Sequence, residues 1–152
     1  MEATRENDAC GVGIRGVAMA IDSFVWFGLL FVGVYAVAAV TGQIEVTNGN
    51  VDASLQGGAG MAALGLSLGL GVAYHALLEW WAGRTIGKAL VAIRVVTEDG
   101  TTPSAGASLA RNVVRLVDWL PLFYVVGIAT MAFSSDSQRL GDRLAGTTVV
   151  RT

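Results

Sequence analysis

Two charged residues near the start of the chain are the first candidates for chemistry, because they lie in or beside apolar sequence. Asp22 interrupts an apolar stretch over residues 16–40, and Arg15 precedes it by seven positions on the same helical face. Seven helical residues rise about 10 Å, so these two side chains lie too far apart to pair. A charge inside a membrane span costs roughly 2.5–3.5 kcal/mol on insertion scales. Asp22 is therefore expected to have a partner, a water-filled pocket or a proton.

A polar stripe later in the chain offers such partners. Arg111, Arg115 and Asp118 follow one another at spacings of four and three residues, so they share one helical face. We expect Asp22 to face Arg111 or Arg115, and we expect Arg15 to face Asp118 or the acidic end of the second apolar stretch. These contacts would form an intramembrane charge network or an ion-binding site.

His75 and Glu79 are four residues apart, a spacing that suits a proton relay or half of a metal site. A metal site needs three or four ligands, and this chain has one histidine and one cysteine. We therefore expect no metal and no cofactor, and we expect Glu79 to form a salt bridge with Arg15 or Arg84. Because the single histidine lies in apolar helical sequence, no serine has a credible base, and we expect no enzymatic activity.

Residues 83–88, Gly-Arg-Thr-Ile-Gly-Lys, are similar to a phosphate-binding loop. The similarity is incomplete, because that loop needs four residues between its glycines and Ser or Thr after the lysine, whereas here three intervene and Ala89 follows. We expect neither a nucleotide nor a nucleic acid partner. Arg84 and Lys88 are instead expected to meet anionic lipid headgroups.

The elements that position these residues belong in a bilayer. With 53% hydrophobic and 14% charged residues, the chain is too apolar for an ordinary soluble domain. Two stretches, about 15–40 and 57–81, are long enough to span a hydrocarbon core of roughly 30 Å. Trp80 and Trp81 close the second span at the membrane interface, where indoles are enriched. A signal peptide is a poorer interpretation of the first stretch, which is too long and is interrupted by Asp22.

The basic residues predict the topology. All ten lie outside residues 16–83, and the loop over residues 41–58 carries only Glu45 and Asp52. By the positive-inside rule that loop is outside, and both the N-terminus and the region from Arg84 onward are cytoplasmic. We expect a multi-pass protein of the plasma membrane. Gly65 and Gly69 form a GxxxG motif, so the second span is expected to pack against a helix of this chain or of a second copy.

The remaining sequence predicts a single domain over residues 1–152, all-α and membrane-embedded, with short cytoplasmic β-strands. Residues 89–97 and 146–151 are rich in β-branched side chains and could pair with each other. Residues 104–134 form a third membrane segment. A single crossing would place the C-terminal arginines outside, so we favour a re-entrant helical hairpin broken near Pro121 over one crossing.

Four segments together resemble the RDD family of small membrane proteins, named for one arginine and two aspartates. Arg15 and Asp22 are similar to the start of its first helix, and the other matching segments are residues 83–96, 111–118 and 138–150. The second aspartate is either Asp118 or Asp142. The resemblance implies little about mechanism, although some members are linked to sodium/proton exchange.

Two functions fit these residues. In the first, the chain is a non-catalytic membrane module that binds a partner or lipid, and its charges fix the packing of the helices. In the second, it is a cation (sodium)/proton transporter or a subunit of one, with Asp22 as the titrating site. A carboxylate in a polar pocket within lipid could bind sodium and protons in competition. Two spans offer little wall for a transport path, so the second function would need an oligomer or another membrane subunit.

Overall fold

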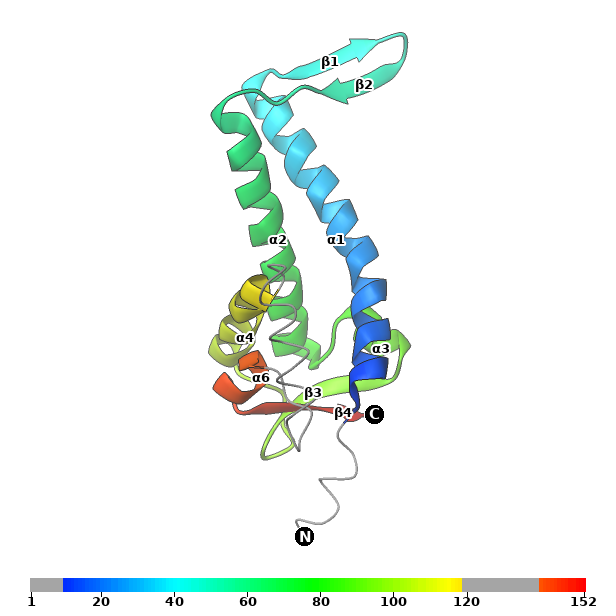
Figure 1. Cartoon of the computed structure of the whole chain (residues 1–152), viewed down its shortest axis with the longest axis vertical. Helices are drawn as coiled ribbons and strands as arrows, with labels where there is room; N and C mark the ends of the chain where they lie inside the picture. Colours follow the sequence, from blue (N-terminus) through cyan, green and yellow to red (C-terminus); the bar gives the residue numbers. More distant parts are fainter. Residues whose placement is uncertain (1–9, 119–139) are drawn as a thin grey trace. The chain divides into compact units, whose positions relative to one another are not determined.

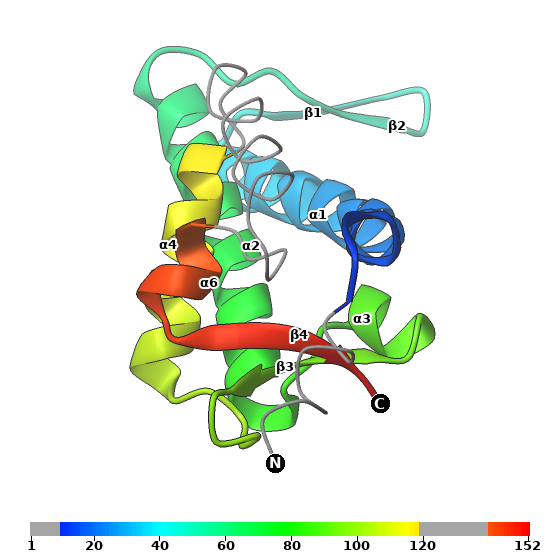
Figure 2. The same ribbon diagram turned by 60° about the horizontal axis from the view of Figure 1, so that its bottom comes forward.

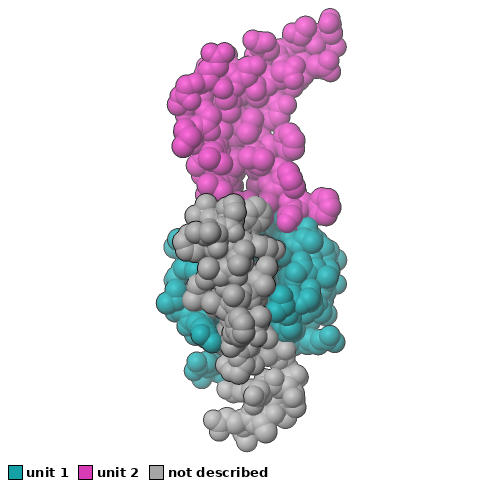
Figure 3. Space-filling view, in the orientation of Figure 1, with its two compact units in different colours: residues 1–22, 72–152 teal, residues 23–71 magenta. Residues whose placement is uncertain are grey.

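The computed structural model describes residues 10–118 and 140–152. It comprises two compact units, each considered by itself: unit 1 contains residues 1–22 and 72–152, and unit 2 contains residues 23–71 (Figure 3). Two long helices, α1 (Val12–Thr41) and α2 (Gly58–Ala82), each contribute to both units. They cover the two predicted spans, and both are long and apolar enough to cross a membrane.

Unit 2 contains a β-hairpin between the two helices (Figure 1). Its strands are β1 (Ile44–Thr47) and β2 (Asn50–Ala53), which pair antiparallel. Asn48 and Gly49 make the turn with φ of 53° and 81°. Two successive positive φ values match the right-handed twist of the strands, and Asn-Gly tolerates them best. The hairpin was not among the predicted elements.

The helices of unit 2 pack through small residues. A Cβ atom on Gly33 would lie 2.1 Å from the Ser67 hydroxyl oxygen, and one on Gly71 would lie 2.5 Å from the Trp26 ring. These two glycines therefore allow a close approach that a side chain would block. The GxxxG motif is not part of this packing, because a Cβ on Gly65 or Gly69 would meet none of the described residues within 4 Å.

Unit 1 contains short elements around one antiparallel strand pair (Figure 2). In chain order they are α3 (Ile86–Leu90), β3 (Ile93–Thr97), α4 (Ala105–Asp118), α6 (Leu140–Leu144) and β4 (Thr147–Arg151). The predicted pairing is confirmed, with Val95 opposite Val149. The first strand is shorter than predicted, because residues 86–90 form a helix capped by Thr85. Ile93, Val95 and Val149 are almost completely buried and form the small apolar core.

Helix α4 has the reverse of the usual amphipathic arrangement. It buries Ser108, Arg111 and Asn112, while Leu109 and Val113 remain 51% and 48% exposed. A helix on the surface of a soluble protein would instead turn its apolar face inward. Residues 105–118 provide the first part of the predicted third membrane segment; Pro121 and the predicted break lie outside the described residues.

Candidate functional site: a buried charge cluster

Glu79, on α2, is the most deeply buried charge among the described residues of unit 1, with 0% of its surface exposed. One carboxylate oxygen forms an ion pair with the Lys88 ammonium, from α3. The other lies 3.2 Å from Arg111 Nε and accepts a hydrogen bond of 2.9 Å from the Asn112 side-chain amide. Because a buried carboxylate needs its acceptor positions filled, these contacts join α2, α3 and α4 through one side chain.

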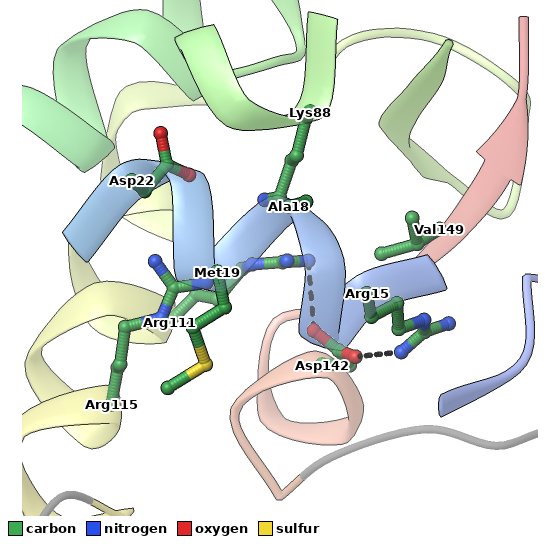
Figure 4. Close-up of a pocket in the computed structure, with 9 residues that line it drawn as sticks. All are labelled: Arg15, Ala18, Met19, Asp22, Lys88, Arg111, Arg115, Asp142 and Val149. Carbon is green, nitrogen blue, oxygen red and sulfur yellow. Dashed lines mark hydrogen bonds and ion pairs between the residues drawn. The ribbon is translucent and has the colours of Figure 1, made fainter. Parts of the chain in front are cut away.

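Asp142, on α6, extends the cluster to the start of α1. Its two oxygens lie 2.9 Å from Arg15 Nη1 and 2.8 Å from Arg111 Nη1 (Figure 4). Arg111 Nη1 also donates to the Thr147 hydroxyl at 3.1 Å, which connects the cluster to β4. Gly141 allows α6 to approach α4, because a Cβ there would lie 3.0 Å from the Arg111 carbonyl oxygen.

Asp22 makes a different kind of contact: its carboxylate caps helix α3. It accepts hydrogen bonds from the Tyr74 hydroxyl at 2.9 Å, the Thr85 hydroxyl at 2.6 Å and the Gly87 amide at 2.8 Å. The Tyr74 oxygen in turn accepts from the Ile86 amide at 3.2 Å. The first amides of a helix have no partner within it, and a carboxylate is favoured there because the N-terminal end is positive.

The segment that resembled a phosphate-binding loop therefore does bind an anion, but the anion belongs to the protein. Gly87 has no Cβ, and one built there would lie 2.1 Å from the Ala18 carbonyl oxygen and 2.8 Å from Asp22 Cγ. The glycine is what lets the loop backbone lie directly against α1. Residues 83–88 thus bind an internal carboxylate through the Gly87 amide and the Thr85 hydroxyl.

Arg115 and His75 form the last contact of the cluster. Arg115 Nη1 lies 2.7 Å from His75 Nδ1. A guanidinium group can only donate, so Nδ1 is the unprotonated nitrogen of the imidazole and accepts this bond. His75 also packs edge-on against the Tyr74 ring, with 4.9 Å between ring centroids. Among the described residues, no three His, Cys, Asp or Glu side chains are grouped so that they could hold a metal ion.

A small cavity lies among these groups, with a volume of about 20 Å³. That is enough space for roughly one water molecule. Figure 4 shows its lining, which consists of Arg15, Ala18, Met19, Asp22, Lys88, Arg111, Arg115, Asp142 and Val149. Burial, together with the neighbouring Arg111 and Arg115, lowers the pKa of Lys88 to about 7 against the opposing effect of Glu79. Charged side chains of both signs, four basic and two acidic, thus line the cavity together with apolar groups.

Several predicted contacts are wrong. Arg15 pairs with Asp142, and Glu79 pairs with Lys88 and Arg111 rather than with Arg15 or Arg84. Lys88 is 5% exposed, so it does not reach a lipid headgroup. The cause is local: α3 turns the Lys88 side chain toward Glu79, and a buried carboxylate holds it there.

The other predicted site residues are Asp22, the residues predicted at the membrane interface, and Asp118. Asp22 lines one cavity with Arg111 and Arg115, but its hydrogen bonds go to neutral groups. Trp80 and Trp81 are 50% and 81% exposed, and Arg84 is also exposed. The side chain of Asp118 lies outside the described residues.

A model of the RDD family matches residues 9–146. The chain belongs to the RDD family. This confirms the resemblance, and together with the two apolar helices it indicates a membrane protein. No curated protein and no solved structure matches the chain. Of the two candidates for the second aspartate of the RDD family, Asp142 contacts Arg15, whereas the side chain of Asp118 lies outside the described residues.

Sequence reasoning missed the residues that surround Asp22 in this RDD protein. Thr85 precedes α3 as its cap, and its hydroxyl accepts from the Lys88 amide at 3.4 Å while donating to Asp22. A threonine ahead of a short helical segment is a recognisable cap signal. Tyr74 and Gly87 gave no such signal, because their roles depend on how residues 83–88 lie against α1.

Proposed function

We propose that this RDD protein is a non-catalytic membrane module in which the charge cluster holds the cytoplasmic ends of the helices together and the surrounding surface binds lipid. The observation that carries the proposal is that the three clustered carboxylates are occupied by donors of the chain itself. Asp22 accepts three hydrogen bonds, Glu79 contacts three side chains, and Asp142 contacts two arginines.

The acceptor count favours a structural role over ion exchange. A transported cation must be coordinated by oxygen atoms that are available when it arrives. Here the oxygens of Asp22 bind the Thr85 and Tyr74 hydroxyls and the Gly87 amide at 2.6–2.9 Å. A cation would compete with these donors for the Asp22 oxygens, and the loss of a hydrogen bond to a charged group costs about 1.5–3 kcal/mol.

The surface of unit 1 supports the lipid part of the proposal. Helix α4 exposes Leu109 and Val113 while it buries Arg111, and α2 exposes Leu77, Trp80 and Trp81. Apolar groups outside and charges inside suit hydrocarbon and headgroups better than water, because the lipid phase cannot solvate unpaired charge. We propose that α4 lies in the cytoplasmic leaflet of the plasma membrane, with the N-terminus and the C-terminus both in the cytoplasm.

The position of α4 can be measured by fluorescence. In a Cys10→Ser background, an environment-sensitive dye is attached to Leu109→Cys, and the protein is reconstituted in vesicles that contain lipids with quenching groups at different depths. Quenching by acyl-chain groups is expected for Leu109→Cys. The matched control is Arg94→Cys, an exposed position on β3, which should remain accessible to a water-soluble quencher. Equal access of the water-soluble quencher to both dyes would refute the lipid contact.

Sodium/proton transport is the competing function, and the polar cavity beside Asp22 is the observation in its favour. Purified protein in liposomes is exposed to a pH gradient, and sodium entry is followed in wild type and Asp22→Asn. The structural proposal expects no flux above empty liposomes and a lower melting temperature for Asp22→Asn. Sodium flux in wild type that Asp22→Asn abolishes at an unchanged melting temperature would establish the transporter instead.

A further inference from the structure

The hairpin of unit 2 has one apolar face and one acidic face. Because side chains alternate along a strand, the register of β1 and β2 gives one face four apolar side chains: Ile44, Val46, Val51 and Ala53. The other face carries Glu45 and Asp52, which lie directly across from each other. Val46 and Val51 are 68% and 48% exposed. A ribbon of two strands is marginal in water by itself, so an exposed apolar face on it requires an explanation.

The lengths of the apolar helices place this hairpin at a membrane surface. Residues 24–40 of α1 contain no Asp, Glu, Lys or Arg and rise about 25 Å as a helix. Residues 59–78 of α2 also contain none and rise about 30 Å, which is the thickness of a hydrocarbon core. Hydrocarbon that covers both runs ends close to Thr41 and Gly58, the residues between which the hairpin lies.

Tyr35 holds the hairpin at this depth. It lies about 9 Å before the end of α1, and its hydroxyl donates to the Val51 carbonyl oxygen at 3.0 Å. The hairpin therefore stays close to the last turns of α1, and Figure 1 shows it directed to one side, across the helices of unit 2. The Tyr35 ring also stacks on exposed Phe31, with 6.5 Å between centroids. An apolar ring with a polar tip is typical of the membrane interface.

The charges of unit 2 indicate how the hairpin meets the membrane. Residues 23–71 contain no Lys or Arg, so no cationic side chain of this unit attracts a lipid phosphate. Apolar contact remains, because an exposed apolar side chain gains free energy when it leaves water. We propose that the hairpin is an interfacial anchor: Val46 and Val51 contact lipids of the leaflet in which α1 ends, and the acidic face meets water. In the topology proposed above, this is the outer leaflet.

The test places a dye on each face of the hairpin. In a Cys10→Ser background, an environment-sensitive dye is attached to Val46→Cys or, as the matched control, to Glu45→Cys on the opposite face. The full chain is reconstituted in zwitterionic phospholipid vesicles whose lipids carry quenching groups near the headgroup. The lipid should quench the dye at Val46→Cys, and aqueous iodide should quench it several-fold less than the dye at Glu45→Cys. High salt should leave this difference unchanged, because the contact is apolar.

Three results would overturn the anchor. The first is equal access of iodide to both dyes. The second is protection of Val46→Cys from iodide without quenching by the lipid; disulfide formation between copies would then identify a second copy as the cover. The third is protection that requires an anionic phospholipid and disappears at high salt, since that would indicate electrostatic attraction.

A second pair of variants makes the result independent of one substitution. Val51→Cys and Asp52→Cys repeat the comparison on β2, at exposed positions where a cysteine should not disturb folding. Val51→Cys should behave like Val46→Cys, and a dye at Val51 that is open to iodide would contradict a shared lipid-facing surface. The anchor does not depend on how α4 contacts lipid. Lipid quenching at Leu109→Cys with none at Val46→Cys would refute the anchor and leave the proposed function intact.

Discussion

The interiors of units 1 and 2 contain different kinds of side chain. Unit 1 contains all ten basic residues of the sequence, and it buries Arg15, Glu79, Arg111 and Asp142 in one cluster. Unit 2 contains no basic residue, and its packed positions are occupied by small side chains such as Ala38 and Ala63. Both units expose large apolar side chains on the outside. The difference therefore lies in what holds each interior together.

In lipid this difference has a clear physical meaning. Apolar burial provides little drive for helix association when the solvent itself is apolar, so unit 2 depends on close contact at Gly33 and Gly71. The elements of unit 1 are short and cannot associate through close helix–helix contacts of this kind. Ion pairs and charged hydrogen bonds orient these short elements instead, so that each element has a specific partner. We expect unit 1 to be sensitive to single charge changes and unit 2 to tolerate polar changes.

Glu79→Gln should give the largest effect. The substitution keeps the shape of the side chain but leaves Lys88 without its buried counter-charge and removes one of the two carboxylates that Arg111 contacts. Removing one partner of a buried ion pair costs about 3–5 kcal/mol. Chemical unfolding in mild detergent measures the change. Glu45→Gln is the control in unit 2, where the carboxylate is exposed on the hairpin, and it should change stability by less than about 0.5 kcal/mol. Similar losses for both would remove the distinction between the units.

A pair of glycine substitutions sharpens the comparison. Gly87→Ala places a Cβ 2.1 Å from the Ala18 carbonyl oxygen, so the loop must move away from α1 and Asp22. Overpacking of this kind costs about 1–3 kcal/mol. Gly28→Ala, in the part of α1 that belongs to unit 2, meets no described atom within 4 Å and should stabilise the helix by up to about 1 kcal/mol. Melting temperatures should shift in opposite directions. A stabilising Gly87→Ala would contradict the close contact.

The pH dependence of unit 1 follows from Lys88. Its pKa in the folded protein is about 7, below the ordinary value of 10.5, because of burial. Between these two pH values the unfolded chain binds the proton and the folded chain does not, so stability rises with pH across this window. One proton limits the slope to about 1.4 kcal/mol per pH unit.

The measurement compares unfolding free energies of wild type and Lys88→Met from pH 6.5 to 9.5. The rise should be present in wild type and absent in the variant. Parallel curves for the two proteins would show that Lys88 stays charged throughout, with Glu79 outweighing its burial.

The sequence predicted the parts of this structure that depend on composition and periodicity. The length of the apolar stretches indicated α1 and α2, and β-branched residues indicated the pairing of β3 with β4. The hairpin was also readable, because Asn48-Gly49 between short β-prone runs is a strong turn signal.

The partners of the charges were beyond sequence reasoning. Helical spacing placed Arg111 and Arg115 on one face, but the spacing does not predict which carboxylate contacts them. Asp142 reaches Arg15 through the packing of α6 on α4, and Asp22 meets Thr85 because a glycine allows residues 83–88 to lie against α1. Both outcomes depend on the paths of loops, which periodicity does not describe.

Ser67→Ala should give the smallest effect, because it changes the one polar contact described between the helices of unit 2. The Ser67 hydroxyl donates to the Ala63 carbonyl of its own helix at 2.7 Å and lies 3.4 Å from the Leu30 carbonyl on α1. Polar contacts between membrane helices average about 0.6 kcal/mol. A change of that size or less in the unfolding free energy is expected, measured beside Glu79→Gln in the same detergent. A loss comparable with that of Glu79→Gln would mean that unit 2 also depends on a polar contact, and the contrast between the two interiors would fail.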